Sequence, residues 1–162
     1  MKTKKIIYTT LLIVWMIVIF LFSNQNAEKS ESTSDKVAST IIDTVETVTK
    51  HDIPKEEKHS FIEDTRVIIR KTAHFSSYLV LGILAFLTIK SYTNQRIVLY
   101  TIIFCFLYAC SDEIHQLFST GRTCRILDIL IDTSGSVVGS SLISTLNKIF
   151  INKLSKSKSS LV

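Results

Sequence analysis

The chain has 162 residues, of which 46% are hydrophobic, and its formal net charge is +5. This length suits a single domain, and one proline with four glycines favours long helices over a turn-rich β fold. Three cysteines, two of them inside the apolar run "TIIFCFLYAC", argue against a secreted protein held by disulfides. The basic residues are dispersed near helix ends, so we expect no nucleic-acid partner.

The first apolar segment covers residues 6–22 and follows Lys2, Lys4 and Lys5. A membrane-spanning helix needs about 17 to 25 apolar residues. A cleaved signal peptide usually has a shorter apolar region of about 7 to 15 residues, with small residues before the cleavage site. The following "FSNQNAEK" is a poor cleavage site, so the segment is predicted to be an uncleaved anchor.

Three more apolar segments follow, at 73–89, 97–118 and 126–150. We therefore predict an all-α fold, an integral membrane four-helix bundle that forms one domain over residues 1–162. The acidic residues all lie in 28–64 or at 112, 113, 128 and 132, whereas the N-terminus, the 90–96 turn and the tail 151–162 carry basic residues without acids. The positive-inside rule then places both termini in the cytoplasm and residues 23–72 outside.

The predicted outer segment, residues 23–72, has two helical patterns separated by Pro54. Apolar residues recur at helical spacing before the proline, at Val37, Ile41, Val45 and Val48. We interpret the segment as amphipathic helices that lie on the bilayer or cap the bundle. A helical lid that binds a partner is the alternative.

Polar side chains from three predicted spans lie at one depth, near the outer ends of those spans. They are His74, Tyr78, Asp112, Glu113, His115, Gln116, Asp128 and Asp132, with Arg122 and Arg125 in the loop above them. A charge at the centre of a membrane helix costs roughly 2.5 to 3.5 kcal/mol on insertion scales, so such groups are tolerated when they face each other or a water-filled cleft. The pattern predicts a polar pocket in the outer leaflet.

Three interpretations of this pocket remain open: structural ion pairs such as Asp128 with Arg125, a divalent metal site, and a histidine–carboxylate acid/base pair. The zinc-protease pattern H-E-x-x-H is absent, and we expect neither a metal nor another cofactor. Gly135 and Gly139 continue the helix face of Asp128 and Asp132, and this small-residue spacing indicates close helix packing.

Four stretches resemble the VanZ-like family, named after a teicoplanin-resistance protein of bacterial membranes. They are "FSNQN" at 22–26, "RKTAHFSSYLVLG" at 70–82, "SDEIHQLFSTGR" at 111–122 and "DILIDTSGSVVG" at 128–139. By this resemblance the family's polar positions fall on Ser23, Gln25, Lys71, His74, Tyr78, Asp112, Glu113, Gln116, Arg122 and Asp128. Asp132 stands where many relatives have Asn, which adds a negative charge here.

The resemblance implies a multi-pass protein of the bacterial cell membrane that contributes to teicoplanin resistance. Two hypotheses for its action follow. In the first, the outer pocket engages membrane lipids, a lipid-linked cell-wall precursor or the lipoglycopeptide itself. In the second, the histidine and carboxylates catalyse acid/base or metal-assisted chemistry on a lipid-linked substrate. A small permease or assembly protein is a third alternative, and the sequence does not define the oligomeric state.

Overall fold

The computed structural model describes the chain except for residues 1, 24–26, 51–52, 119–124 and 160–162. The described part contains five α-helices and no strand. The helices are α1 (Lys2–Ser23), α2 (Ala27–Thr49), α3 (Lys55–Tyr92), α4 (Ile97–Gln116) and α5 (Ile126–Ser159). All except α2 are long and apolar enough to cross a membrane. The predicted all-α fold with four candidate spans is therefore confirmed.

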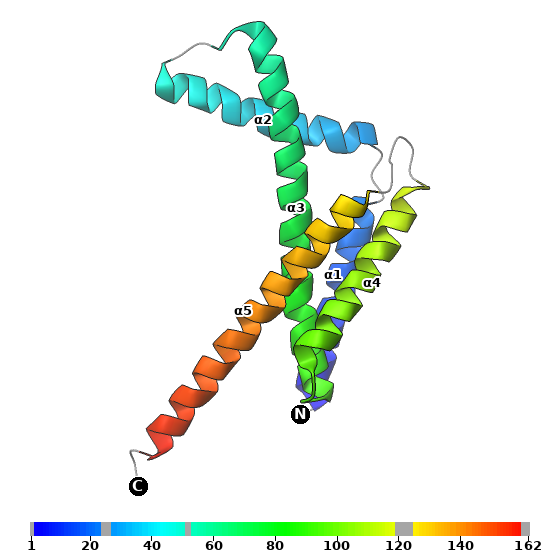
Figure 1. Ribbon diagram of the computed structural model, residues 1–162, viewed down its shortest axis with the longest axis vertical. Helices are drawn as coiled ribbons and strands as arrows, with labels where there is room; N and C mark the ends of the chain where they lie inside the picture. The colour runs from blue at the N-terminus through cyan, green and yellow to red at the C-terminus, as the bar shows by residue number, and fades with distance from the viewer. Residues whose placement is uncertain (1, 24–26, 51–52, 119–124, 160–162) are drawn as a thin grey trace.

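Helix α3 contains both the second helix expected in the outer segment and the second span, because it runs without a break for 38 residues. At about 1.5 Å per residue it is about 57 Å long, nearly twice the roughly 30 Å of a bilayer's hydrocarbon core. It begins directly after Pro54, whose carbonyl accepts a hydrogen bond from the Lys58 amide at 2.9 Å. Pro54 is the residue just before the first helical turn, and its missing amide hydrogen prevents a helix from continuing into α3 from the preceding residues. The N-terminal part of α3 therefore extends beyond the length that a single span requires (Figure 1).

Helix α2 lies across this N-terminal part of α3, beyond the end of α1 (Figure 1). Salt bridges join the two helices at both ends of the contact. Arg66 Nε lies 2.6 Å from Asp35 Oδ1, and Lys58 Nζ lies 2.8 Å from carboxylate oxygens of both Asp43 and Glu46. The pKa of Glu46 is lowered, chiefly because its carboxylate accepts the Lys58 hydrogen bond.

The face of α2 that is buried differs from its most apolar face. Ser34, Ala38 and Ile42 are buried. The row of Val37, Ile41, Val45 and Val48 is instead between 45% and 77% exposed. This helix therefore presents an uncovered apolar row, as an amphipathic helix on a bilayer does.

Helices α3 and α5 form the most extensive contact in the molecule. Three glycines allow their backbones to approach closely, because a Cβ atom at any of them would meet backbone atoms of the partner helix. A Cβ at Gly135 would meet the carbonyl oxygen of Phe75, and one at Gly139 would meet that of Leu79. The close approach indicated by the glycine spacing is thus observed, and it fixes the depth at which residues of α5 face α3.

Helix α1 packs against α3 and α4 through two hydrogen bonds to backbone carbonyls. The Trp15 indole donates to the Ser77 carbonyl at 2.9 Å, and the Tyr108 hydroxyl donates to the Met16 carbonyl at 2.7 Å. The buried core between these helices includes Leu12, Ile19, Tyr78, Leu81, Ala85, Cys105 and Ala109. The outward faces of the bundle stay apolar, as expected for helices that contact lipid.

Candidate functional site

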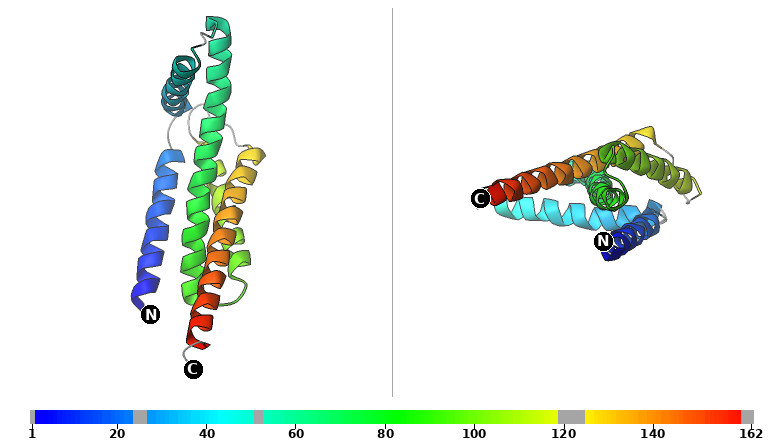
Figure 2. Two further views of the ribbon diagram at one scale, coloured as in Figure 1. Left: turned by 90° about the vertical axis from the view of Figure 1, so that its left-hand side faces the viewer. Right: turned by 90° about the horizontal axis from the view of Figure 1, so that it is seen from below.

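The polar residues of the bundle meet at one end, which we call the pocket end. Helices α1 and α4 end there and α5 begins there, all beside the middle of α3 and below α2 (Figures 1 and 2). Because the chain crosses the bundle in alternating directions, residues far apart in the sequence reach the same level. Ser23, His74, Asp112 and Asp132 come from four different helices.

Three of these side chains form what we call the acid–histidine cluster: His74, Asp112 and Asp132. One nitrogen or oxygen atom from each lies within 4.8 Å of the other two. Asp132 is completely buried and Asp112 is 2% exposed. His74 Nδ1 lies 3.4 Å from Asp132 Oδ1. Two buried carboxylates and a partly buried imidazole therefore lie close together.

Several polar atoms of the pocket end make no hydrogen bond within the described part of the chain. They include both carboxylate oxygens of Asp132, of which Oδ1 has only the His74 contact at 3.4 Å, together with Oδ1 of Asp112 and the hydroxyl oxygen of Tyr78. A buried polar group without a hydrogen bond costs about 1 to 3 kcal/mol. Such atoms, gathered at one end of the bundle, therefore lower the stability of the fold unless another group binds them.

Asp112 is held in place by neighbours on its own helix and on α1. The Gln116 side-chain amide, one turn further along α4, donates to Ser23 Oγ at 2.9 Å and lies 3.4 Å from Asp112 Oδ2. Gln116 and Ser23 are both buried. This link joins the last turns of α1 and α4, and Oδ1 of Asp112 accepts no hydrogen bond among the described residues.

Glu113 has a different role from its neighbour Asp112. Its carboxylate accepts a hydrogen bond from the Arg125 backbone amide at 3.0 Å, immediately before α5 begins. A carboxylate at a helix N-terminus satisfies a free amide and complements the helix dipole. Glu113 therefore fixes the start of α5 to the end of α4, which positions Asp132 two turns later.

The other predicted pocket residues lie around the cluster. The His115 ring lies against Phe20 of α1, with ring centroids 4.3 Å apart. Asp128 is partly buried one turn before Asp132, and Lys71 is partly buried on α3. Gln25 and Arg122 lie outside the described residues.

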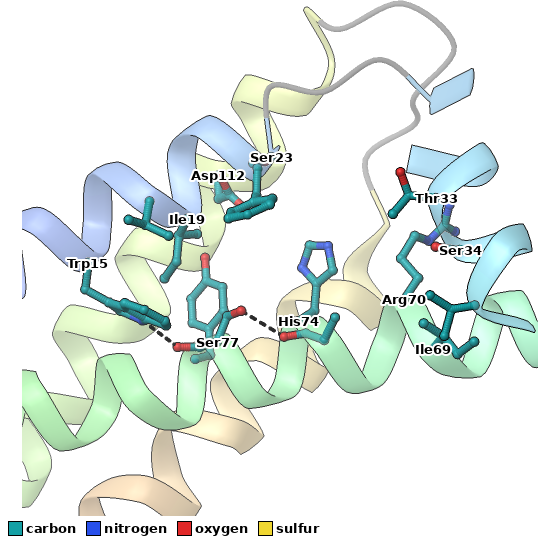
Figure 3. A pocket seen from close by; sticks show the side chains of 15 residues that line it. Trp15, Ile19, Ser23, Thr33, Ser34, Ile69, Arg70, His74, Ser77 and Asp112 are labelled. Carbon is teal, nitrogen blue, oxygen red and sulfur yellow. Dashed lines mark hydrogen bonds between the residues drawn. The ribbon is translucent and has the colours of Figure 1, made fainter. Parts of the chain in front are cut away.

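A cavity of about 350 Å³ opens beside the cluster, between α1, α2 and α3. Figure 3 shows the His74 ring and the Asp112 side chain in this space, with Thr33 and Ser34 of α2 on its far side. Its walls are mainly apolar and include Trp15, Val18, Ile19, Phe22, Val37 and Ile69. The cavity thus combines apolar walls with a histidine and a carboxylate at one side.

The sequence also matches a known protein family. The sequence matches the VanZ/LLP1 family over residues 8–148, which is most of the chain. The chain belongs to the VanZ/LLP1 family. Together with the four apolar helices, this makes it a multi-pass membrane protein. No curated protein and no solved structure matches the chain significantly.

The structure adds residues to the pocket of this VanZ/LLP1 protein that the sequence did not indicate. Trp15 contributes an apolar wall, and Arg70, Thr33 and Ser34 contribute polar groups. Arg70 is one turn before His74, so helical spacing could have placed it there. Thr33 and Ser34 reach the cavity because α2 folds over it, and no pattern in the sequence shows that crossing.

Proposed function

We propose that this VanZ/LLP1 protein resides in the bacterial cell membrane and that its pocket binds a lipid or a lipid-linked cell-envelope molecule in the outer leaflet. By occupying or withholding that molecule, the protein would limit the action of teicoplanin, a lipoglycopeptide that acts at the outer face. The observation that carries this proposal is the cavity itself. Its apolar walls suit an acyl chain, while His74, Asp112 and Arg70 suit a polar headgroup.

The size and composition of the cavity support a small ligand. Ligand sites are typically about 300 to 1,000 Å³, largely apolar and equipped with a few placed polar groups. The cavity volume of about 350 Å³ lies at the lower end of that range. It suits part of a lipid, such as a headgroup region with the first segment of a chain, better than a whole glycopeptide.

The charge distribution supports the proposed orientation. Lys4, Lys5, Lys90 and Lys148 lie toward the end of the bundle opposite the pocket end, where the acidic residues are absent. Basic residues without acids favour the cytoplasmic side, which would place both termini inside and the pocket outside. The exposed apolar row of α2 then suits the outer surface of the bilayer.

Drug susceptibility tests this function in cells that express matched membrane levels of each variant. We expect the wild type to protect against teicoplanin more than against vancomycin. His74→Ala and Asp112→Asn should return cells to the susceptibility of the empty vector. Asp64→Asn removes one exposed acid from the same helix as His74 and should protect as the wild type does. Equal protection by all variants would refute a functional pocket.

A second candidate function, chemistry on a lipid-linked substrate, is favoured by one specific contact. His74 Nδ1 and Asp132 Oδ1 are 3.4 Å apart beside the cavity, and a carboxylate that orients an imidazole is a recurring acid/base arrangement. Lipid extracts of expressing and deleted cells separate the two functions. A lipid species that is converted only when His74 and Asp132 are intact would favour the enzyme, and unchanged lipids would favour binding alone.

A further inference from the structure

The acid–histidine cluster carries an imbalance of charge that the described chain does not resolve. With a neutral imidazole, the carboxylates of Asp112 and Asp132 would bring two negative charges into a buried site. Two carboxylates that share a site disfavour each other's ionised form. Protonated His74 could offset one of these charges through its contact with Asp132. A divalent cation would offset both.

The distances within the cluster suit a common ligand. Around an ion bound at about 2.1 Å, tetrahedral ligand atoms lie roughly 3.4 Å apart. His74 Nδ1 and Asp132 Oδ1 are separated by 3.4 Å, and the three ligand atoms lie within 4.8 Å of one another. The Asp112 carboxylate therefore needs only a small side-chain adjustment to reach an ion that His74 and Asp132 hold.

The polar atoms without hydrogen bonds provide a second, independent indication. Oδ2 of Asp132 and Oδ1 of Asp112 accept no hydrogen bond within the described residues, although both side chains are at least nine-tenths buried. These are the same carboxylates that the distances bring together. The Tyr78 hydroxyl is equally buried and makes no hydrogen bond among those residues. Metal coordination would satisfy several of these atoms at once.

We propose that His74, Asp112 and Asp132 bind a divalent metal ion that accepts both imidazole and carboxylate ligands, Mn²⁺ or Zn²⁺. One nitrogen and two oxygen donors favour such an ion over Ca²⁺, which takes six to eight oxygen ligands. Three protein ligands leave coordination positions open. The cavity lies beside these ligands, since His74 and Asp112 line it as well.

This site does not depend on the proposed function, because the three side chains can hold an ion whether or not a lipid enters the cavity. The two claims also fail separately. A chain that binds the ion but gives no protection against teicoplanin would refute the function and leave the metal site intact. A chain that protects but binds no ion would refute the metal site alone.

Equilibrium binding to the purified full chain in detergent tests the metal site. Mn²⁺ is followed by electron paramagnetic resonance and Zn²⁺ by calorimetry, after dialysis against a chelator. We expect one ion per chain. Asp132→Asn and Asp112→Asn should weaken binding at least about 100-fold, since removal of even an outer-shell partner costs roughly 10- to 100-fold. Asp64→Asn, which removes an exposed acid, should bind as the wild type does.

The outcomes decide the proposal in both directions. Absence of binding by the wild type, or binding that Asp132→Asn leaves unchanged, would overturn it. Equal weakening by Asp64→Asn would also overturn it, because the effect would then be one of overall charge. If Asp132→Asn does not yield folded protein on size-exclusion chromatography, His74→Cys serves instead. A thiolate in place of the imidazole should shift preference from Mn²⁺ to Zn²⁺ and Cd²⁺, and an unchanged preference would count against the site.

Discussion

The two ends of the bundle differ in how far their charged side chains are buried and in what those side chains contact. At the pocket end, two buried carboxylates lie beside a partly buried histidine, and several oxygens there accept no hydrogen bond within the described chain. At the other end, Lys4, Lys5 and Lys90 line a second cavity of about 450 Å³. There each charge is partly or fully exposed, and the described contacts are to neutral groups. Lys90 donates to the Asn147 side-chain oxygen at 2.8 Å, and Lys5 lies 4.7 Å from the centre of the Tyr92 ring.

The contrast indicates which end is specialised. A lysine that keeps its charge near water while its stem crosses apolar surface is ordinary at the end of a membrane helix. Buried carboxylates that lie close together are unusual, because they lower the free energy of unfolding unless another group stabilises them. Proteins retain such costs chiefly at sites where they act. We therefore expect substitutions at the pocket end to alter function and those at the basic end to alter little.

The largest effect should follow a change that separates α3 from α5. Gly135→Leu would push a side chain into the Phe75 carbonyl, which is backbone and cannot move aside, next to His74. We expect a loss of about 3 kcal/mol or more, since overpacking costs about 1 to 3 kcal/mol even where side chains can adjust. Ser134→Leu places the same side chain at the adjacent, exposed position. Thermal unfolding in detergent should show the loss only for the glycine variant, and equal stability of both would contradict the described packing.

A smaller effect of opposite sign should follow removal of one buried acid. In chelator, Asp112→Asn eliminates the repulsion between two neighbouring carboxylates, so the protein should become more stable. A gain of about 1 kcal/mol corresponds to a melting temperature about 2 to 4 °C higher for a chain of this size. Thermal unfolding of the wild type and the variant, with and without Mn²⁺ or Zn²⁺, measures this gain in melting temperature. A lower melting temperature for the variant in chelator would show that the two acids stabilise each other through a shared proton or hydrogen bond.

The docking of α2 over the cavity should weaken as the pH falls into the acidic range. The Lys58 hydrogen bond lowers the pKa of Glu46 below its ordinary value of 4.5. A group with a depressed pKa stabilises the folded arrangement above its unfolded pKa and loses that contribution as pH falls through the folded value. We expect the protection factors of the α2 amides, which are exchange rates corrected for the intrinsic pH dependence, to be constant from neutral pH down to about pH 5 and to fall below about 4.5. Glu46→Gln should remove the pH dependence, and an unchanged profile in that variant would assign it to another group.

The smallest effect should follow loss of a charge at the basic end. Lys90→Met keeps the apolar stem and removes the hydrogen bond to Asn147. A partly exposed contact of this kind contributes about 1 kcal/mol or less. Thermal unfolding should shift by no more than a few degrees, and teicoplanin susceptibility should stay at the wild-type value. A loss of protection equal to that of Asp112→Asn would contradict the difference between the two ends.

Patterns along the chain were sufficient to predict much of this architecture. Apolar length gave the four spans, and the four-residue spacing of His74 with Tyr78 and of Asp128 with Asp132 placed each pair on one helix face. The family resemblance indicated Ser23 as a characteristic polar position. In the structure this serine, at the end of α1, accepts the Gln116 hydrogen bond and so links α1 to α4. These features are local, so the sequence contains them.

Other features depended on tertiary contacts that no local pattern encodes. Asp112 and Glu113 were both predicted to line the pocket, yet Asp112 belongs to the acid–histidine cluster whereas Glu113 fixes the start of α5. Adjacent helix positions differ by about 100°, so which of them turns inward depends on the neighbouring helices. The crossing of α2 over the cavity likewise depends on its salt bridges with α3, between partners 12 to 31 residues apart in the chain.

Retention of a lipid by the pocket is the most direct test of the central claim. Native mass spectrometry of the chain released from mild detergent would compare wild type with Ala73→Trp, which adds bulk to the cavity wall. Ser76→Trp adds the same bulk at an exposed position outside the cavity and is the control. We predict that wild type and Ser76→Trp retain a lipid of one reproducible mass and that Ala73→Trp does not. Equal retention by all three, or by none, would contradict the account.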